Sequence, residues 1–145
     1  MNKKEVRNRL KDKKGFTLIE LLVVMVIIGL IAALVGPNIF KNLGKGQQKA
    51  ARAQIELLGQ VLDSYRLDVG NYPTTSEGLN ALITSSGAEG WDGPYLKKTK
   101  VPLDPWKHPY HYQSPGTNGD YDLFSYGADN APGGEGDSKD IASWE

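Results

Sequence analysis

An uninterrupted apolar run near the start of the chain constrains the fold more than any other feature. Residues 18–35 read LIELLVVMVIIGLIAALV and contain a single charged side chain, Glu20. As an α-helix this run extends roughly 27 Å, which is about the thickness of the hydrocarbon core of a bilayer. A chain of 145 residues has little room to bury a helix that is apolar on every side. We therefore expect the run to span a membrane rather than to lie in a soluble core.

The charges that flank the run predict its orientation. Residues 1–15 contain seven Lys and Arg against two acidic residues, a net charge of +5, although the whole chain carries no net charge. By the positive-inside rule this basic flank stays in the cytoplasm, so the residues after Pro37 face outward. A cleaved secretory signal is the alternative, but its apolar region would be shorter and would end at a small-x-small cleavage site.

Glu20 is the exception within the run, because a carboxylate in a bilayer is costly and commonly has a functional partner. Snorkelling to the membrane boundary is the simpler interpretation. Residues 13–20 read KKGFTLIE, so a basic segment ends in Gly15, and Phe16 stands just ahead of the apolar run.

This string resembles the class III leader of type IV prepilins and of the pseudopilins of type II secretion. The resemblance implies that a prepilin peptidase cuts between Gly15 and Phe16, and that Phe16 becomes the N-methylated first residue. Residues 1–15 are then the cleaved leader, 16–37 the transmembrane and filament-core segment, and 38–145 the periplasmic domain. Glu20 is expected to act in assembly by pairing with the α-amino group of Phe16 on a neighbouring subunit, which neutralises two costly charges.

The apolar pattern continues after the run as one face of a helix. Its members recur mainly at three- and four-residue spacing and are Ile55, Leu57, Leu58, Val61, Leu62 and Tyr65. We expect one long helix from about residue 16 to about residue 69, ended by Gly70. Gly36-Pro37 and residues 44–46 are its predicted weak points.

After Gly70 the composition changes to glycine, proline and aromatic residues. Thr74 and Glu77 form a capping-box pattern that predicts a short helix through residue 83. Residues 109–113 and 121–126 predict two strands joined by a hairpin loop.

The order of the head segments strengthens the resemblance, because NYPTTSEGLNAL, VPLDPWKHPYHYQSPG and YDLFSYGADN are similar to the head of the major pseudopilins of type II secretion. Members of that family often carry Gly where Lys107 stands. The resemblance implies an α+β, type IV pilin-like fold. In that fold one long N-terminal helix packs on a small head with a short helix, an antiparallel β-sheet and a C-terminal loop.

The acidic C-terminal segment has two interpretations. Residues 115–145 carry a net charge of −6, which by composition is typical of a disordered tail. Ile141 and Trp144, however, have the character of anchors that return to the core. The family resemblance implies one structural calcium here, an ion that takes about six to eight oxygen ligands and would fold the tail onto the strand at 121–126. The expected ligands are the side chains of Asp129 and Asp140 and carbonyls near Tyr126, Ala131 and Gly134, with Asp137 as a further candidate.

No pattern in the sequence predicts catalysis, and we expect no enzymatic activity. The chain has no cysteine, which excludes disulfides and thiolate metal sites. His108 and His111 have Pro109 between them and no cysteine nearby, so a zinc site is not expected. The aromatic residues lack the interleaved Lys and Arg that surfaces for nucleic acid need.

The resemblance, together with the orientation that the basic flank predicts, implies a major pseudopilin: a single-pass inner-membrane protein with a cytoplasmic N-terminus and a periplasmic head. It would polymerise into a periplasmic pseudopilus that helps to drive folded proteins across the outer membrane. Its expected partners are further copies of itself, the prepilin peptidase, minor pseudopilins and the inner-membrane assembly platform.

Two other functions remain open at this stage. A major type IV pilin for adhesion, motility or DNA uptake commonly closes its C-terminal loop with a disulfide, which this chain cannot form. The second alternative is a monomeric signal-anchored periplasmic domain. In such a protein Glu20 and the Gly15-Phe16 junction would have no function.

Overall fold

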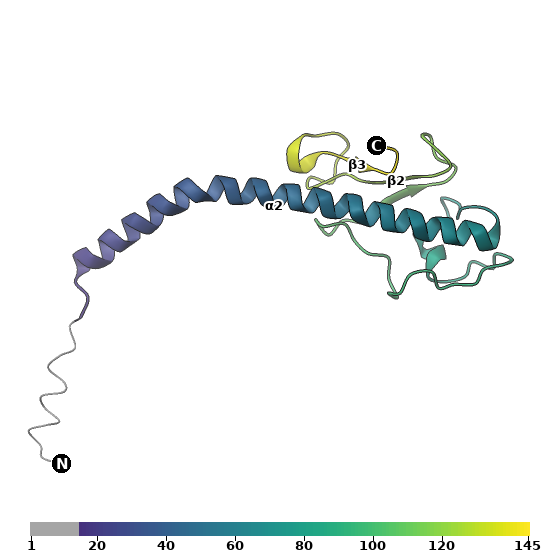
Figure 1. The fold of residues 1–145 in the computed structure, drawn as a ribbon, viewed down its shortest axis with the longest axis horizontal. Helices are drawn as coiled ribbons and strands as arrows, with labels where there is room; N and C mark the ends of the chain where they lie inside the picture. Colours follow the sequence, from purple (N-terminus) through teal and green to yellow (C-terminus); the bar gives the residue numbers. More distant parts are fainter. Residues whose placement is uncertain (1–14) are drawn as a thin grey trace, which may run out of the picture. The chain divides into compact units, whose positions relative to one another are not determined.

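The computed structural model describes residues 15–145, so the predicted leader before Gly15 lies outside the described part of the chain. In chain order the elements are helix α2 (Leu18–Val69), the 3-10 helix η1 (Gly78–Leu82), strands β1 (His111–Gln113) and β2 (Asp122–Ser125), the 3-10 helix η2 (Gly136–Ser138) and strand β3 (Ile141–Ala142) (Figure 1). The chain divides into two compact units, which meet within α2 between Phe40 and Lys41.

The described part of the first unit is the apolar beginning of α2. Its large hydrophobic side chains are all exposed, including Leu18 and Leu34, which are 87% and 80% exposed. The helix continues through Pro37, so the predicted weak point does not end it. Within the described residues α2 is the one helix long and apolar enough to cross a bilayer, with a mean hydropathy of 3.1 over its most apolar window.

The second half of α2 supplies one side of the core of the head. The predicted face is confirmed at four positions, since Ile55, Leu58, Leu62 and Tyr65 are all buried. The prediction that Leu57 belongs to this face is wrong, because its side chain is 60% exposed. The small side chain of Ala51 fills the face one turn earlier.

Gly70 ends α2 as the sequence predicts. Its φ of 94° lies in the left-handed region, and its N–H donates to the carbonyl oxygen of Arg66 at 2.7 Å. Glycine adopts this conformation without the clash that a Cβ would cause, and it satisfies one of the last free carbonyls of the helix.

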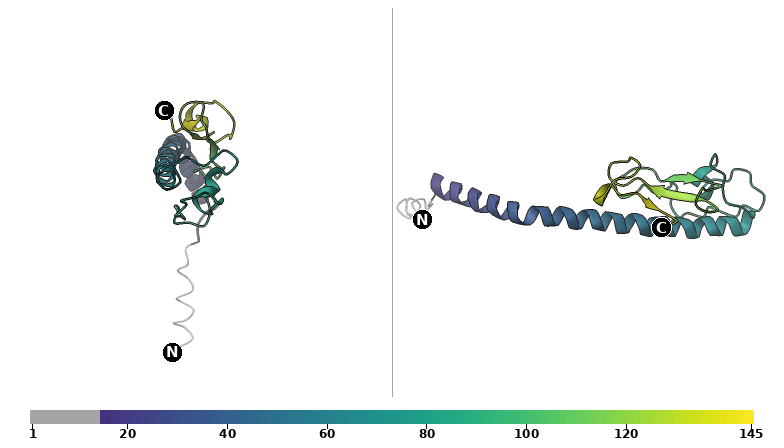
Figure 2. Two further views of the ribbon diagram at one scale, coloured as in Figure 1. Left: turned by 90° about the vertical axis from the view of Figure 1, so that its right-hand side faces the viewer. Right: turned by 90° about the horizontal axis from the view of Figure 1, so that it is seen from above.

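Three antiparallel strands, in the order β1-β2-β3, form the sheet of the head beside α2 (Figure 2). The hairpin of β1 and β2 is confirmed, with His111 opposite Phe124. The sequence did not predict β3, which pairs Ala142 with Phe124. Ile141 is 4% exposed and anchors the chain end in the core, whereas Trp144 remains 45% exposed and packs edge-to-face with the Phe124 ring.

The predicted capping box at Thr74 and Glu77 is present. The Thr74 N–H donates to Glu77 Oε2 at 2.8 Å, and the Glu77 N–H donates to Thr74 Oγ1 at 3.3 Å. The helix that follows is shorter than predicted and of the 3-10 type, ending at Leu82. Gly78 has a φ of 61°, which interrupts the α-helical conformation directly after the box.

Candidate functional site

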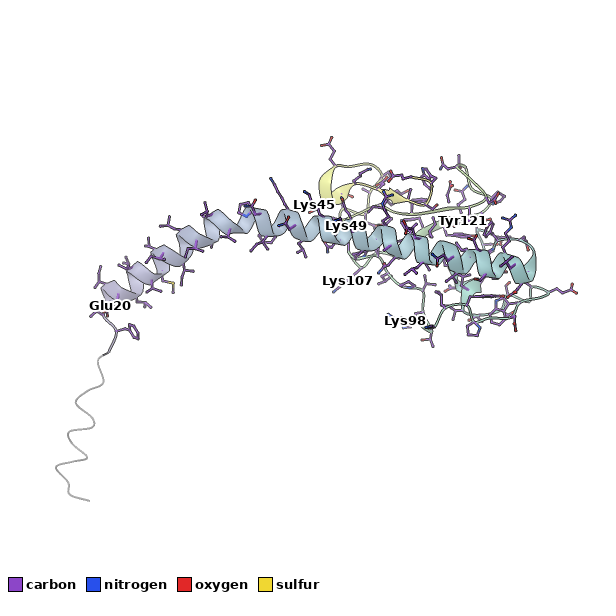
Figure 3. All side chains as sticks on the ribbon, viewed as in Figure 1. Glu20, Lys45, Lys49, Lys98, Lys107 and Tyr121 are labelled. Atoms are coloured by element: carbon purple, nitrogen blue, oxygen red, sulfur yellow. The ribbon has the colours of Figure 1, made fainter. Side chains whose placement is uncertain are left out.

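The predicted processing site lies at the start of α2. Phe16 is 91% exposed, and a Cβ placed on Gly15 would meet no described atom within 4 Å apart from its chain neighbours. Thr17 and Glu20 then form a second capping box: the Thr17 N–H and hydroxyl donate to Glu20 Oε2 at 2.7 and 3.0 Å, and the Glu20 N–H donates to Thr17 Oγ1 at 3.2 Å. Figure 3 shows Glu20 in this first turn.

The box gives Glu20 a partner within its own chain. In the unprocessed chain the nitrogen of Phe16 is part of a peptide bond, so the α-amino group that Glu20 is predicted to meet does not exist. The carboxylate instead satisfies donors of the first helical turn, which lowers the cost of placing it in an apolar segment. Thr17 was not predicted as a partner of Glu20, although the T-x-x-E spacing that identified Thr74 and Glu77 is present here too.

The predicted calcium loop, residues 126–140, is a tight curl between β2 and β3. Gly127, Gly133 and Gly134 have φ values of 72°, 88° and 91°. The Gly133 N–H donates to Asp140 Oδ2 at 2.9 Å, while Asp140 Oδ1 is buried without a hydrogen-bond partner in the described residues. Asp129 is exposed, and its Oδ1 accepts the N–H of Ala131 at 3.2 Å.

The third predicted carboxylate, that of Asp137, is directed at helix α2. The Asp137 carboxylate lies against Gly44 of α2, which has no side chain to exclude it. Within residues 15–145 no three acidic or histidine side chains gather closely enough to hold a metal ion.

A buried polar network that no sequence pattern predicted lies beside the loop. Ser125 at the end of β2 is fully buried, and its hydroxyl donates to Asp104 Oδ2 at 2.6 Å. Asp104 is 4% exposed, and its Oδ1 accepts the N–H groups of Trp106 at 3.0 Å and His108 at 2.7 Å. Asp104 and Ser125 are 21 positions apart in the sequence, so no local pattern connects them.

A long helix with an exposed apolar beginning, followed by a small α+β head, defines a pilin-like subunit. Residues 10–36 match the family model described as "Prokaryotic N-terminal methylation motif", and residues 38–144 match the model described as "Type II secretion system (T2SS), protein G". The chain belongs to the type II secretion protein G family, the family of the major pseudopilin, as its sequence predicts.

Curated relatives agree over almost the whole chain. The "Type II secretion system core protein G" of Pseudomonas aeruginosa is 42% identical to this chain, and the match covers 93% of this chain and 97% of the relative. The protein of the same name from Vibrio cholerae is also 42% identical, and that match covers 94% of each chain. The crystal structure of the major pseudopilin of enterohaemorrhagic Escherichia coli is similar, with a TM-score of 0.60 and 36% identity over 74% of this chain and 95% of that one. The predicted pilin-like fold is confirmed.

Proposed function

We propose that this chain is the major subunit of a type II secretion pseudopilus, made as an inner-membrane precursor and polymerised into a periplasmic filament that helps to move folded proteins outward. One observation carries the proposal. The first half of α2 exposes an apolar surface all around, and its one carboxylate stands four residues after the Phe16 that processing would free. Lipid covers such a surface in the precursor, and neighbouring copies of the same helix cover it in a filament.

The pairing of Glu20 with the freed amine of Phe16 would supply the specificity of assembly. Inside a filament the carboxylate and the amine lose their contact with water, so each stabilises the other only if both are charged and adjacent. In the unassembled chain the Thr17 cap holds Glu20 at the helix terminus, close to the residue that becomes the first of the mature chain. The prepilin peptidase, minor pseudopilins and the inner-membrane assembly platform are the partners that this function requires.

The capping box provides a matched pair of variants to test the role of Glu20. Glu20→Gln keeps the T-x-x-Q cap but removes the charge, and Glu20→Leu removes both. If the charge pairs with the amine, both variants insert into the membrane and both lose most filament formation in secretion-competent cells. Wild-type filament yield from Glu20→Gln would show that capping alone matters and would contradict the proposed pairing.

Intact mass measured on the same membrane preparations reports processing separately. The proposal predicts loss of residues 1–15 and addition of one methyl group in the wild-type protein, and an unprocessed precursor for Gly15→Leu. Normal-length mature protein from Gly15→Leu would contradict the peptidase assignment.

We also propose that the C-terminal loop holds one structural calcium ion. Three features support a fit to such an ion. Within residues 15–145, Asp140 has a buried oxygen without a donor, and Asp129 is exposed and accepts one N–H. The positive φ values of Gly127, Gly133 and Gly134 permit the tight backbone curl that would bring the carbonyls of Tyr126, Ala131 and Gly134 into the ligand set. Asp137 contributes less to the proposal, because its carboxylate lies against α2. The bound ion would supply positive charge that keeps β3 and the chain end against the head.

Thermal unfolding with calcium and with a chelator tests this proposal. Calcium should raise the midpoint of wild-type protein in proportion to the logarithm of its concentration, because the ion binds only the folded state. Asp140→Asn should abolish this rise, and Glu89→Gln, which changes an exposed carboxylate outside the loop, should preserve it. A wild-type midpoint that calcium leaves unchanged would contradict the proposed site.

A further inference from the structure

The peptide unit that follows β2 is held by the buried network at Asp104 and Ser125. The Ser125 hydroxyl donates to Asp104 Oδ2 at 2.6 Å and accepts the N–H of Gly127 at 3.1 Å. A hydroxyl has one hydrogen to donate. Because Asp104 takes that hydrogen, the lone pairs of the Ser125 oxygen are left for Gly127.

The same network fixes the other polar group of Gly127. His108 Nδ1 lies 3.3 Å from the Gly127 carbonyl oxygen, and the His108 N–H is itself held by Asp104 Oδ1 at 2.7 Å. Gly127 also packs closely against the returning chain, since a Cβ there would come within 2.9 Å of the Asp137 carbonyl oxygen. Asp104 therefore anchors Gly127 through Ser125 on one side and through His108 on the other.

Fixing the Gly127 N–H also fixes the carbonyl of Tyr126. The two groups belong to one planar trans peptide unit and point in opposite directions. With its N–H directed at Ser125 in the protein interior, the unit directs the Tyr126 oxygen away from that hydroxyl. The Tyr126 carbonyl is one of the oxygens that we assign to the calcium loop.

We infer that Asp104 and Ser125 are positioning residues for the cation site of the C-terminal loop: they preset the Tyr126 carbonyl before any ion is bound. This inference rests on the calcium site proposed above. Outer residues that orient metal ligands contribute about 10- to 100-fold to affinity. Neither residue touches the ion, and both act through the backbone of residues 126–127.

Calcium affinity of the full chain in detergent micelles, measured by titration calorimetry, is the first test. Ser125→Ala leaves the Gly127 N–H without its acceptor and should weaken calcium binding by about 10- to 100-fold. Asp104→Asn, which adds donors facing the Ser125 hydroxyl, should weaken it in the same direction.

A control separates positioning from loss of stability. Leu79→Ala removes a buried side chain in η1, outside the loop and the network, and should lower the unfolding midpoint without changing calcium affinity. If Leu79→Ala weakens calcium binding as much as Ser125→Ala does, the effect is one of general stability and the inference is wrong.

Amide hydrogen exchange without calcium is the second test, and it does not depend on the metal. The Gly127 amide should exchange slowly in the wild-type protein with chelator present and much faster in Ser125→Ala. If the wild-type protein binds calcium and Ser125→Ala binds it equally well, the positioning role is excluded while the site stands. If the wild-type protein binds no calcium, the proposed site fails, and the exchange result then reports only a structural network.

Discussion

Lys107 adopts a backbone conformation that favours glycine. Its φ of 70° lies in the left-handed region, at the turn where the sequence resemblance suggested that Gly is common. A side chain in this conformation destabilises the folded state by about 1 kcal/mol relative to glycine. Part of this difference is offset, because glycine loses more conformational entropy than lysine on folding. Lys107→Gly should therefore stabilise the head by up to about 1 kcal/mol, measured as the free energy of unfolding in urea.

Lys98→Gly is the control for this prediction. Both lysines are exposed in the head (Figure 3), but Lys98 does not have a positive φ. We expect Lys98→Gly to be neutral or slightly destabilising, because it only increases the freedom of the unfolded chain. Equal effects of the two substitutions would show that the conformation of Lys107 carries no strain.

At the scale of the element, Gly44 and Gly46 of helix α2 differ in what surrounds them. Gly46 is open to solvent, and Gly46→Ala should stabilise the helix by about 1 kcal/mol. A Cβ on Gly44 would meet the Asp137 carboxylate, so Gly44→Ala should stabilise the protein less than Gly46→Ala does, or should destabilise the head. In an Asp137→Ala background the gain from Gly44→Ala should approach that of Gly46→Ala. Thermal unfolding of the four variants tests this, and an equal gain at both positions in the wild-type background would contradict the contact.

The elements differ in how far their sequences predict them. Periodicity predicts α2 and its buried face well, because each turn repeats the same requirement for apolar side chains. Strand β3 has two residues and exists through its pairing with β2, so no local pattern predicts it. The same applies to the sites: the junction at Gly15 is a contiguous motif, whereas Asp104 and Ser125 meet only after the chain has folded.

At the scale of the head, one buried and two partly buried tyrosines connect stability to alkaline pH. Burial, and to a lesser extent the negative charge of Asp104, raises the pKa of Tyr110 well above its usual 10. Burial raises the pKa of Tyr112 to about 12, and it also raises the pKa of Tyr121. Each phenol therefore loses its proton more readily in the unfolded chain than in the folded one.

The sign of the effect on stability follows from this difference. When the pKa of a tyrosine is higher in the folded chain than in the unfolded one, the neutral phenol contributes to the free energy of unfolding. This contribution is complete below pH 10 and is lost as the pH rises toward 12. The free energy of unfolding should therefore fall steeply in that window, with tyrosinate absorbance appearing together with unfolding. Tyr112→Phe loses the hydrogen bond from the phenol to the Pro73 carbonyl oxygen at 2.7 Å, so it should be less stable at neutral pH. The variant should also lose less stability between pH 10 and 12, because it lacks one of the titrating phenols. A wild-type head whose free energy of unfolding is constant up to pH 12 would contradict this account.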